Sequence, residues 1–193
     1  MFNLPSFLIY IFVTAYTPGP NNIMSMSNAS RFGFKRSFPF NLGILAGFAI
    51  VMPFCSIFSA TLFQYIPKVK IFMLVLGAAY MLYLAWKTYT SSSDLGISES
   101  KEGSFLAGML LQFVNPKIYI YTITSMSAFI LPVYDSPWIL LGFALILSFV
   151  GFTGTVLWSL FGSVFCRLFS EKAKAVNTVM ALLLVYCAIS LFF

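Results

Sequence analysis

A single lysine stands inside a long apolar stretch of this chain. Lys117 lies twelve residues beyond Phe105, which corresponds to about 18 Å of α-helix, and no Asp or Glu lies within an apolar stretch to neutralise it. An ammonium group so deep in an apolar segment is costly and by default indicates function. A lysine that extends to the surface or has a purely structural role is the alternative. Because no carboxylate is available nearby, we expect a ligand to supply the negative partner of Lys117.

Polar residues and prolines gather at two places, Thr17–Asn22 and Gln112–Lys117. Proline lacks a backbone donor and clashes with the preceding turn, so each place should interrupt a helix and leave carbonyl groups without partners. Ser25, three residues after Asn22, shares its helix face. A pair of purely structural kinks is the alternative interpretation. The residues expected to form a binding or translocation site are Pro18, Gly19, Pro20, Asn21, Asn22, Ser25, Gln112, Asn115, Pro116 and Lys117.

The segments that carry these residues are long enough to cross a membrane. Of the 193 residues, 60% are hydrophobic and only 8% are charged, and the mean hydropathy is +0.94, far more apolar than a soluble domain. A membrane span needs about 20 mostly apolar residues. Stretches of this length without a charged residue cover 1–30, 37–67, 136–166 and 175–193, and two more spans run from about 71 to 86 and from about 105 to 131, the second interrupted by Lys117. The sequence therefore predicts an all-α integral membrane protein with six transmembrane helices.

A polar segment near the middle divides the chain into two halves. Residues 90–103 form the predicted linker, with a first three-helix half at 1–89 and a second at 104–193. Each half opens with a broken helix, helix 1 and helix 4 of the six. Because each half has an odd number of spans, the second must lie upside down relative to the first, as in the inverted repeats of secondary transporters. In hydrocarbon, unpaired carbonyls are tolerated only inside protein or beside water, so the two breaks predict a cavity between the halves.

Basic residues lie in short loops rather than in one patch, so the net charge of +6 indicates membrane orientation and not nucleic-acid binding. Lys and Arg concentrate in the loops after the first, third and fifth spans, and none follows the fourth. The positive-inside rule places those odd-numbered loops in the cytoplasm. Both the N-terminus and the C-terminus are therefore predicted to be periplasmic.

Several kinds of chemistry lack their components. The chain has no histidine, no paired carboxylates within a span and no C-x-x-C motif, and its three cysteines, Cys55, Cys166 and Cys187, are interpreted as apolar packing residues. We expect no enzyme, no metal site and no cofactor. A channel would need oligomeric symmetry and repeated carbonyl or charged motifs, and the paired breaks favour alternating access instead. If transport is coupled to protons, Lys117 is the candidate titrating group.

A cavity with one cation, several amides and free carbonyl groups is suited to a zwitterion. The carboxylate would meet Lys117 or a helix N-terminus, and the ammonium would meet neutral oxygens. We therefore expect a small neutral amino acid as the ligand. Gly43 and Gly47 allow close helix contact, either inside the protein or at the face of a homodimer.

Three motifs, in this order and spacing, resemble the lysine exporter and homoserine/threonine exporter family, LysE/RhtB. They are Thr17-Pro18-Gly19-Pro20-Asn21-Asn22, the segment from Gly77 to Trp86, and Asn115-Pro116-Lys117. The resemblance covers essentially the whole chain and implies efflux of a small neutral amino acid across a bacterial inner membrane. Residues 111–115 and 181–188 look most like the branch that exports cysteine and O-acetylserine. An exporter of another amino acid, such as homoserine/threonine or leucine, and a non-transport membrane subunit are the alternatives.

Overall fold

The computed structural model describes residues 2–59, 75, 78–86, 88–90, 104–164 and 173–190, and the regular elements in these residues are helices. The predicted span 71–86 is described only in part, and the predicted linker, apart from Thr90, lies outside the described residues. The named elements are α1 (Leu4–Tyr16), α2 (Pro20–Phe32), α3 (Phe34–Ile57), α5 (Phe105–Val114), α6 (Pro116–Ser125), the π-helix η2 (Met126–Ile130), α7 (Pro137–Val164) and α9 (Ala173–Ser190).

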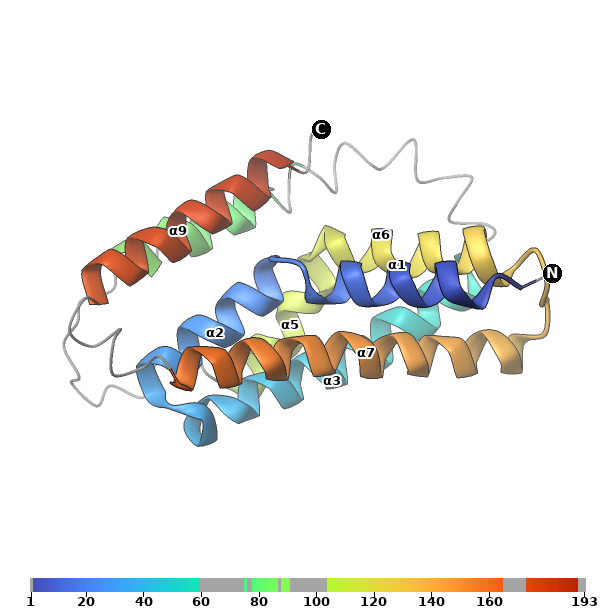
Figure 1. Ribbon diagram of the computed structural model, residues 1–193, viewed down its shortest axis with the longest axis horizontal. Helices are drawn as coiled ribbons and strands as arrows, with labels where there is room; N and C mark the ends of the chain where they lie inside the picture. The colour runs from blue at the N-terminus through green and yellow to red at the C-terminus, as the bar shows by residue number, and fades with distance from the viewer. Residues whose placement is uncertain are drawn as a thin grey trace.

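The helices form an elongated bundle around α3 and α7. Figure 1 shows α1 followed by α2 lying along α7, and both helices contact it. Helix α3 packs against α5 and α7, and α9 lies against α2. With 28 residues, α7 is about 42 Å long at 1.5 Å per residue. The bundle is therefore long enough to match the thickness of a bilayer.

Proline sets both interruptions that the sequence places in its first and fourth spans. Helix α1 ends at Tyr16, and α2 begins with Pro20 as its first residue. Helix α5 ends at Val114, and α6 begins with Pro116 after the N-cap residue Asn115. Proline is tolerated at a first helical position, where its missing N–H would have no partner within the helix. The same residue that cannot continue one helix thus starts the next.

Helix α2 is unusual because it is both polar and central. Every residue from Pro20 to Ala29 is buried, including Asn21, Asn22, Ser25 and Asn28. Helices α7 and α9 show the opposite arrangement on their outward faces, where large apolar side chains such as Trp138, Phe149 and Leu182 are exposed. Exposed apolar side chains together with a buried polar helix are what a lipid environment favours.

Two helices, α3 and α7, are long and apolar enough to cross a membrane by length and composition. Glycines bring α3 very close to α5. A Cβ atom at Gly43 would overlap the carbonyl oxygen of Phe105, and one at Gly108 would overlap that of Phe40. A Cβ atom at Gly47 would lie 2.8 Å from the carbonyl oxygen of Met109. Gly43 and Gly47 therefore serve packing inside the protein, and this helix face is not free to form a dimer.

Candidate functional site

Lys117 binds the open backbone groups at the exposed C-terminal end of α1. Its Nζ atom donates hydrogen bonds to the carbonyl oxygen of Thr17 at 3.0 Å, to Thr17 Oγ1 at 3.1 Å and to the carbonyl oxygen of Pro18 at 3.4 Å. The C-terminal carbonyls of a helix carry partial negative charge. Lys117, at the second helix break, therefore places its positive charge at the first break, although Thr17 is 100 residues away in the sequence.

Two more side chains bind carbonyl groups at the end of α1. Asn22 Nδ2 donates to the carbonyl oxygens of Ala15 at 2.9 Å and of Thr17 at 2.8 Å. Trp158, on α7, donates from Nε1 to the carbonyl oxygen of Tyr16 at 3.0 Å. The sequence predicted unpaired carbonyls at this break and a ligand as the partner of Lys117. In the structure the carbonyls and the lysine are partners of each other.

Three buried amide side chains join the two breaks beneath Lys117. Asn21 Nδ2 donates to Gln112 Oε1 at 2.8 Å, and Asn21 Oδ1 accepts from Gln112 Nε2 and from Asn115 Nδ2, each at 3.2 Å. Gln112 Nε2 also donates to the carbonyl oxygen of Gly108 at 2.7 Å. A buried network with its members paired fixes one arrangement of the helices that carry it. This network fixes α2 relative to α5 and α6.

The two helices that start at the breaks are capped differently. Asn115 Oδ1 accepts a hydrogen bond from the backbone N–H of Lys117 at 3.1 Å, which caps α6. Helix α2 has Gly19 as its N-cap residue and no side-chain cap. The first N–H groups of a helix have no partner within it and attract anions. The start of α2 therefore offers backbone donors beside Lys117.

Gly19 makes room for the lysine side chain. Its backbone is extended, at φ −172°, so its conformation does not require glycine. Its surroundings do, because a Cβ atom there would lie 2.9 Å from Lys117 Cδ and 3.0 Å from Lys117 Nζ. A glycine at this position lets the ammonium reach Thr17.

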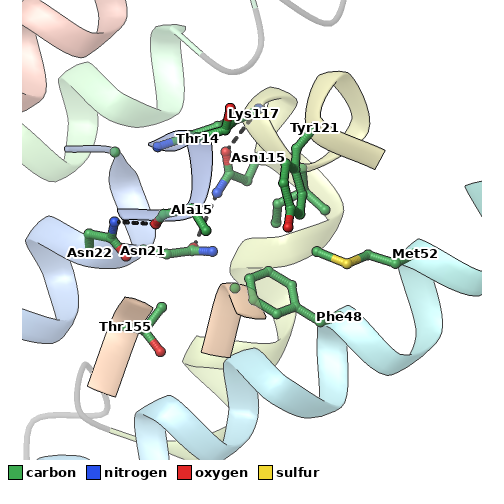
Figure 2. Close-up of a pocket in the computed structure, with 13 residues that line it drawn as sticks. Thr14, Ala15, Asn21, Asn22, Phe48, Met52, Asn115, Lys117, Tyr121 and Thr155 are labelled. Carbon is green, nitrogen blue, oxygen red and sulfur yellow. Dashed lines mark hydrogen bonds between the residues drawn. The ribbon is translucent and has the colours of Figure 1, made fainter. Parts of the chain in front are cut away.

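A cavity of about 40 Å³ lies beside this network, enough for about three waters on a scale in which one water needs roughly 10–15 Å³. Figure 2 shows Asn115 and Lys117 at one side of it, and Phe48 and Met52 at the other. The cavity thus has a polar side at the helix breaks and a largely apolar side. It suits a small solute rather than one with a long side chain. Its wall is made by Thr14, Ala15, Gly19, Asn21, Asn22, Phe48, Met52, Asn115, Lys117, Ile118, Tyr121, Gly151 and Thr155.

The structure brings most of the predicted site residues together. Gly19, Asn21, Asn22, Asn115 and Lys117 line the cavity. Pro18 contributes a carbonyl oxygen, Gln112 belongs to the amide network, and Pro20 and Pro116 start the two helices. Ser25 does not line the cavity: its hydroxyl is buried without a hydrogen-bond partner among the described residues, and its carbonyl accepts from Ser159 Oγ at 3.2 Å.

Sequence reasoning missed the apolar side of the cavity. Phe48, Met52 and Gly151 come from α3 and α7, where the sequence does not distinguish a residue facing a cavity from one facing lipid. Tyr121 had a signal that could have found it. It follows Lys117 by four residues, so the two side chains share a helix face.

Known proteins place this chain in a family. The LysE type translocator family matches residues 12–193. The chain is similar to the cysteine/O-acetylserine efflux proteins of Escherichia coli (strain K12), Escherichia coli O9:H4 (strain HS) and Shigella flexneri, each 40% identical over 190 residues that cover 98% of this chain and 97% of the relative. No solved structure matches the chain. The family is one of transporters, not enzymes, and the chain belongs to it: this is a membrane protein of the LysE type translocator family.

Proposed function

We propose that this protein exports small neutral amino acids of the cysteine and O-acetylserine kind from the cytoplasm. The names of its similar relatives support this substrate class. The observation that carries the proposal is the joining of the two helix breaks around one cavity, through the hydrogen bonds from Lys117 Nζ to Thr17 and Pro18. Export proceeds by alternating access, with the cavity opening first to the cytoplasm and then to the periplasm.

The proposed architecture is six transmembrane helices in two inverted halves. Residues 1–89 and 104–193 form the three-helix halves, and 90–103 links them. In this arrangement α1 with α2 is the broken first span, and α5 with α6 and η2 is the broken fourth span. The protein spans the bacterial inner membrane several times, with both termini in the periplasm. Substrate binds where the two breaks meet.

The groups at the cavity suit both charges of an amino acid. The substrate carboxylate binds the ammonium of Lys117 and the open N-terminus of α2, which has no side-chain cap. The substrate ammonium binds the carbonyl oxygens of Thr17 and Pro18, which Lys117 holds in this structure. Substrate therefore takes over the contacts that Lys117 makes at the end of α1. Loss of this direct link weakens the connection between the two breaks, and the amide network of Asn21, Gln112 and Asn115 is the link that remains.

Efflux from preloaded cells tests the proposal. Labelled cysteine, O-acetylserine, threonine and lysine are loaded into cells that express the parent protein, Lys117→Met or Lys174→Met. Lys174 is an exposed lysine on α9 and gives a matched control for loss of one positive charge. We expect the parent and Lys174→Met to export cysteine and O-acetylserine.

In Lys117→Met we expect export to fall at least about tenfold, the change that corresponds to a loss of about 1.4 kcal/mol of binding free energy. The amount of each variant in the membrane is measured alongside. Export by Lys117→Met at the parental rate would show that Lys117 is not part of the binding site. Export of none of the four amino acids by the parent would overturn the proposed function.

A further inference from the structure

The hydroxyl group of Tyr121 has no role in the contacts described so far. Tyr121 is 4% exposed, and its hydroxyl is buried without a hydrogen-bond partner among the described residues. Burying a hydroxyl without a partner is destabilising, so such a group in a native structure calls for an explanation.

The position of Tyr121 places this buried hydroxyl beside the cavity. Tyr121 lies one helical turn beyond Lys117 on α6 and lines the same cavity. Figure 2 shows its hydroxyl pointing towards the space between Phe48, Met52 and Asn21. The phenol therefore places a polar atom near the apolar side of the cavity.

The tyrosine ring is held in place by its neighbours rather than by its hydroxyl. It stacks on the ring of Tyr10, with centroids 6.4 Å apart and planes 19° from parallel. The hydroxyl of Thr155, which also lines the cavity, is already engaged, because Thr155 Oγ1 donates to the carbonyl oxygen of Phe152 at 2.8 Å. The Tyr121 side chain is therefore held in one position, and its hydroxyl is available to hydrogen-bond a ligand.

We infer that Tyr121 binds the side chain of the exported amino acid and selects short side chains that carry a neutral polar atom. Hydroxyl, thiol and ester groups meet this description. The inference rests on the proposed function, which places the carboxylate and ammonium of the substrate at Lys117 and Thr17. Because the Cβ atoms of residues one helical turn apart are only about 5–6 Å from each other, Lys117 and Tyr121 can contact different parts of the same small molecule in one cavity.

The close contact between Gly151 and Phe48 limits the length of the substrate side chain that fits in the cavity. A Cβ atom at Gly151 would lie 2.7 Å from Cε2 of Phe48, so this wall has no spare room. An added methyl group must displace the Phe48 ring or project into the cavity. Both changes shorten the space next to the Tyr121 hydroxyl.

Pairs of amino acids that differ in one atom test the inference. Cysteine and serine differ from 2-aminobutyrate only in a thiol or hydroxyl in place of a methyl group. Their export is compared in the parent, in Tyr121→Phe and in Tyr119→Phe. Tyr119 is a matched control on the same helix, because its hydroxyl already donates to the carbonyl oxygen of Phe113 at 3.0 Å and it does not line the cavity.

In Tyr121→Phe we expect export of serine and cysteine relative to 2-aminobutyrate to fall about threefold to tenfold, the range produced by losing one neutral hydrogen bond. In Tyr119→Phe the ratio should stay at the parental value. Tyr121→Phe removes an unpaired buried hydroxyl, so the purified variant should unfold at the parental temperature or higher. Binding by the purified parent should raise that temperature more with serine than with 2-aminobutyrate.

An unchanged ratio in Tyr121→Phe, or the same fall in Tyr119→Phe, would overturn the role of Tyr121 while leaving the export function intact. A parent that exports none of these amino acids would instead reject the proposed function. A second variant, Gly151→Ala, should lower export of O-acetylserine more than that of serine. An equal effect on both would contradict the proposed limit on side-chain length.

Discussion

Lys117 could be identified from the sequence, but its partner could not. The sequence has no Asp or Glu within its apolar stretches, and this absence led to the expectation of a ligand as the counterion of the lysine. The structure gives it the carbonyl oxygens of Thr17 and Pro18. Every residue has a carbonyl group, so no sequence pattern marks the ones that a helix break leaves open. The lysine was predictable, whereas its partner required the fold.

Gly19→Ala tests the position of the ammonium without removing its charge. The new methyl group would lie within 3.0 Å of Lys117 Nζ, and the flexible lysine can move away, so the variant should fold. We expect efflux to fall about tenfold, as for a loss of about 1.4 kcal/mol of binding, with a nearly unchanged unfolding temperature. Efflux of labelled O-acetylserine and thermal unfolding in detergent measure the two effects. Efflux by Gly19→Ala at the parental rate would show that transport does not depend on the position of the ammonium.

At the scale of helices, the sequence predicted where the chain is interrupted better than how the helices pack. Proline acts on its own helix, so Pro20 and Pro116 mark the starts of α2 and α6 directly. Likewise α7 begins at Pro137, one residue inside the predicted span 136–166. The face of α3 that meets the cavity depends on its rotation against α5 and α7. The sequence therefore did not distinguish Phe48 and Met52 from the other apolar residues of α3.

Gly43→Ala tests the close packing of α3 and α5. Its methyl group would overlap the backbone of Phe105, which cannot move as a side chain can, so the helices must separate. We expect a loss near the upper end of the about 1–3 kcal/mol typical of overpacking. Gly142→Ala is the matched control on α7, because nothing lies within 4 Å of its added methyl group. Removing a helical glycine there should stabilise by up to about 1 kcal/mol.

Thermal unfolding of the two purified variants in one detergent measures the difference. Gly43→Ala should unfold at a lower temperature than the parent, and Gly142→Ala at the same or a higher one. Equal changes in both variants would show that glycine acts here through helix propensity alone. A dimer that dissociates in Gly43→Ala while the monomer keeps its stability would place this glycine at an interface instead.

At the scale of the whole molecule, the described part of the bundle has ends of different charge. Arg31, Lys35 and Arg36 lie at the turn between α2 and α3. The turn between η2 and α7, residues 131–136, carries Asp135 and no basic residue. The N-terminal Phe2 lies at this second end, since its ring is 6.0 Å from that of Tyr134. Of the loops compared in the sequence, the basic first loop and the fourth loop, which has no basic residue, thus lie at two ends of the described bundle.

Accessibility of single cysteines tests the orientation that this asymmetry implies. Basic loops stay in the cytoplasm, so the end at Arg31–Arg36 should face inwards and the end at Asp135 outwards. In a chain whose native cysteines are replaced, Asp135→Cys should react with a membrane-impermeant maleimide in intact cells. Phe34→Cys, at the basic turn, should react only after the membrane is opened. The reverse pattern would invert the proposed orientation. Reaction of both variants in intact cells would contradict the placement of these two turns on opposite sides of the membrane.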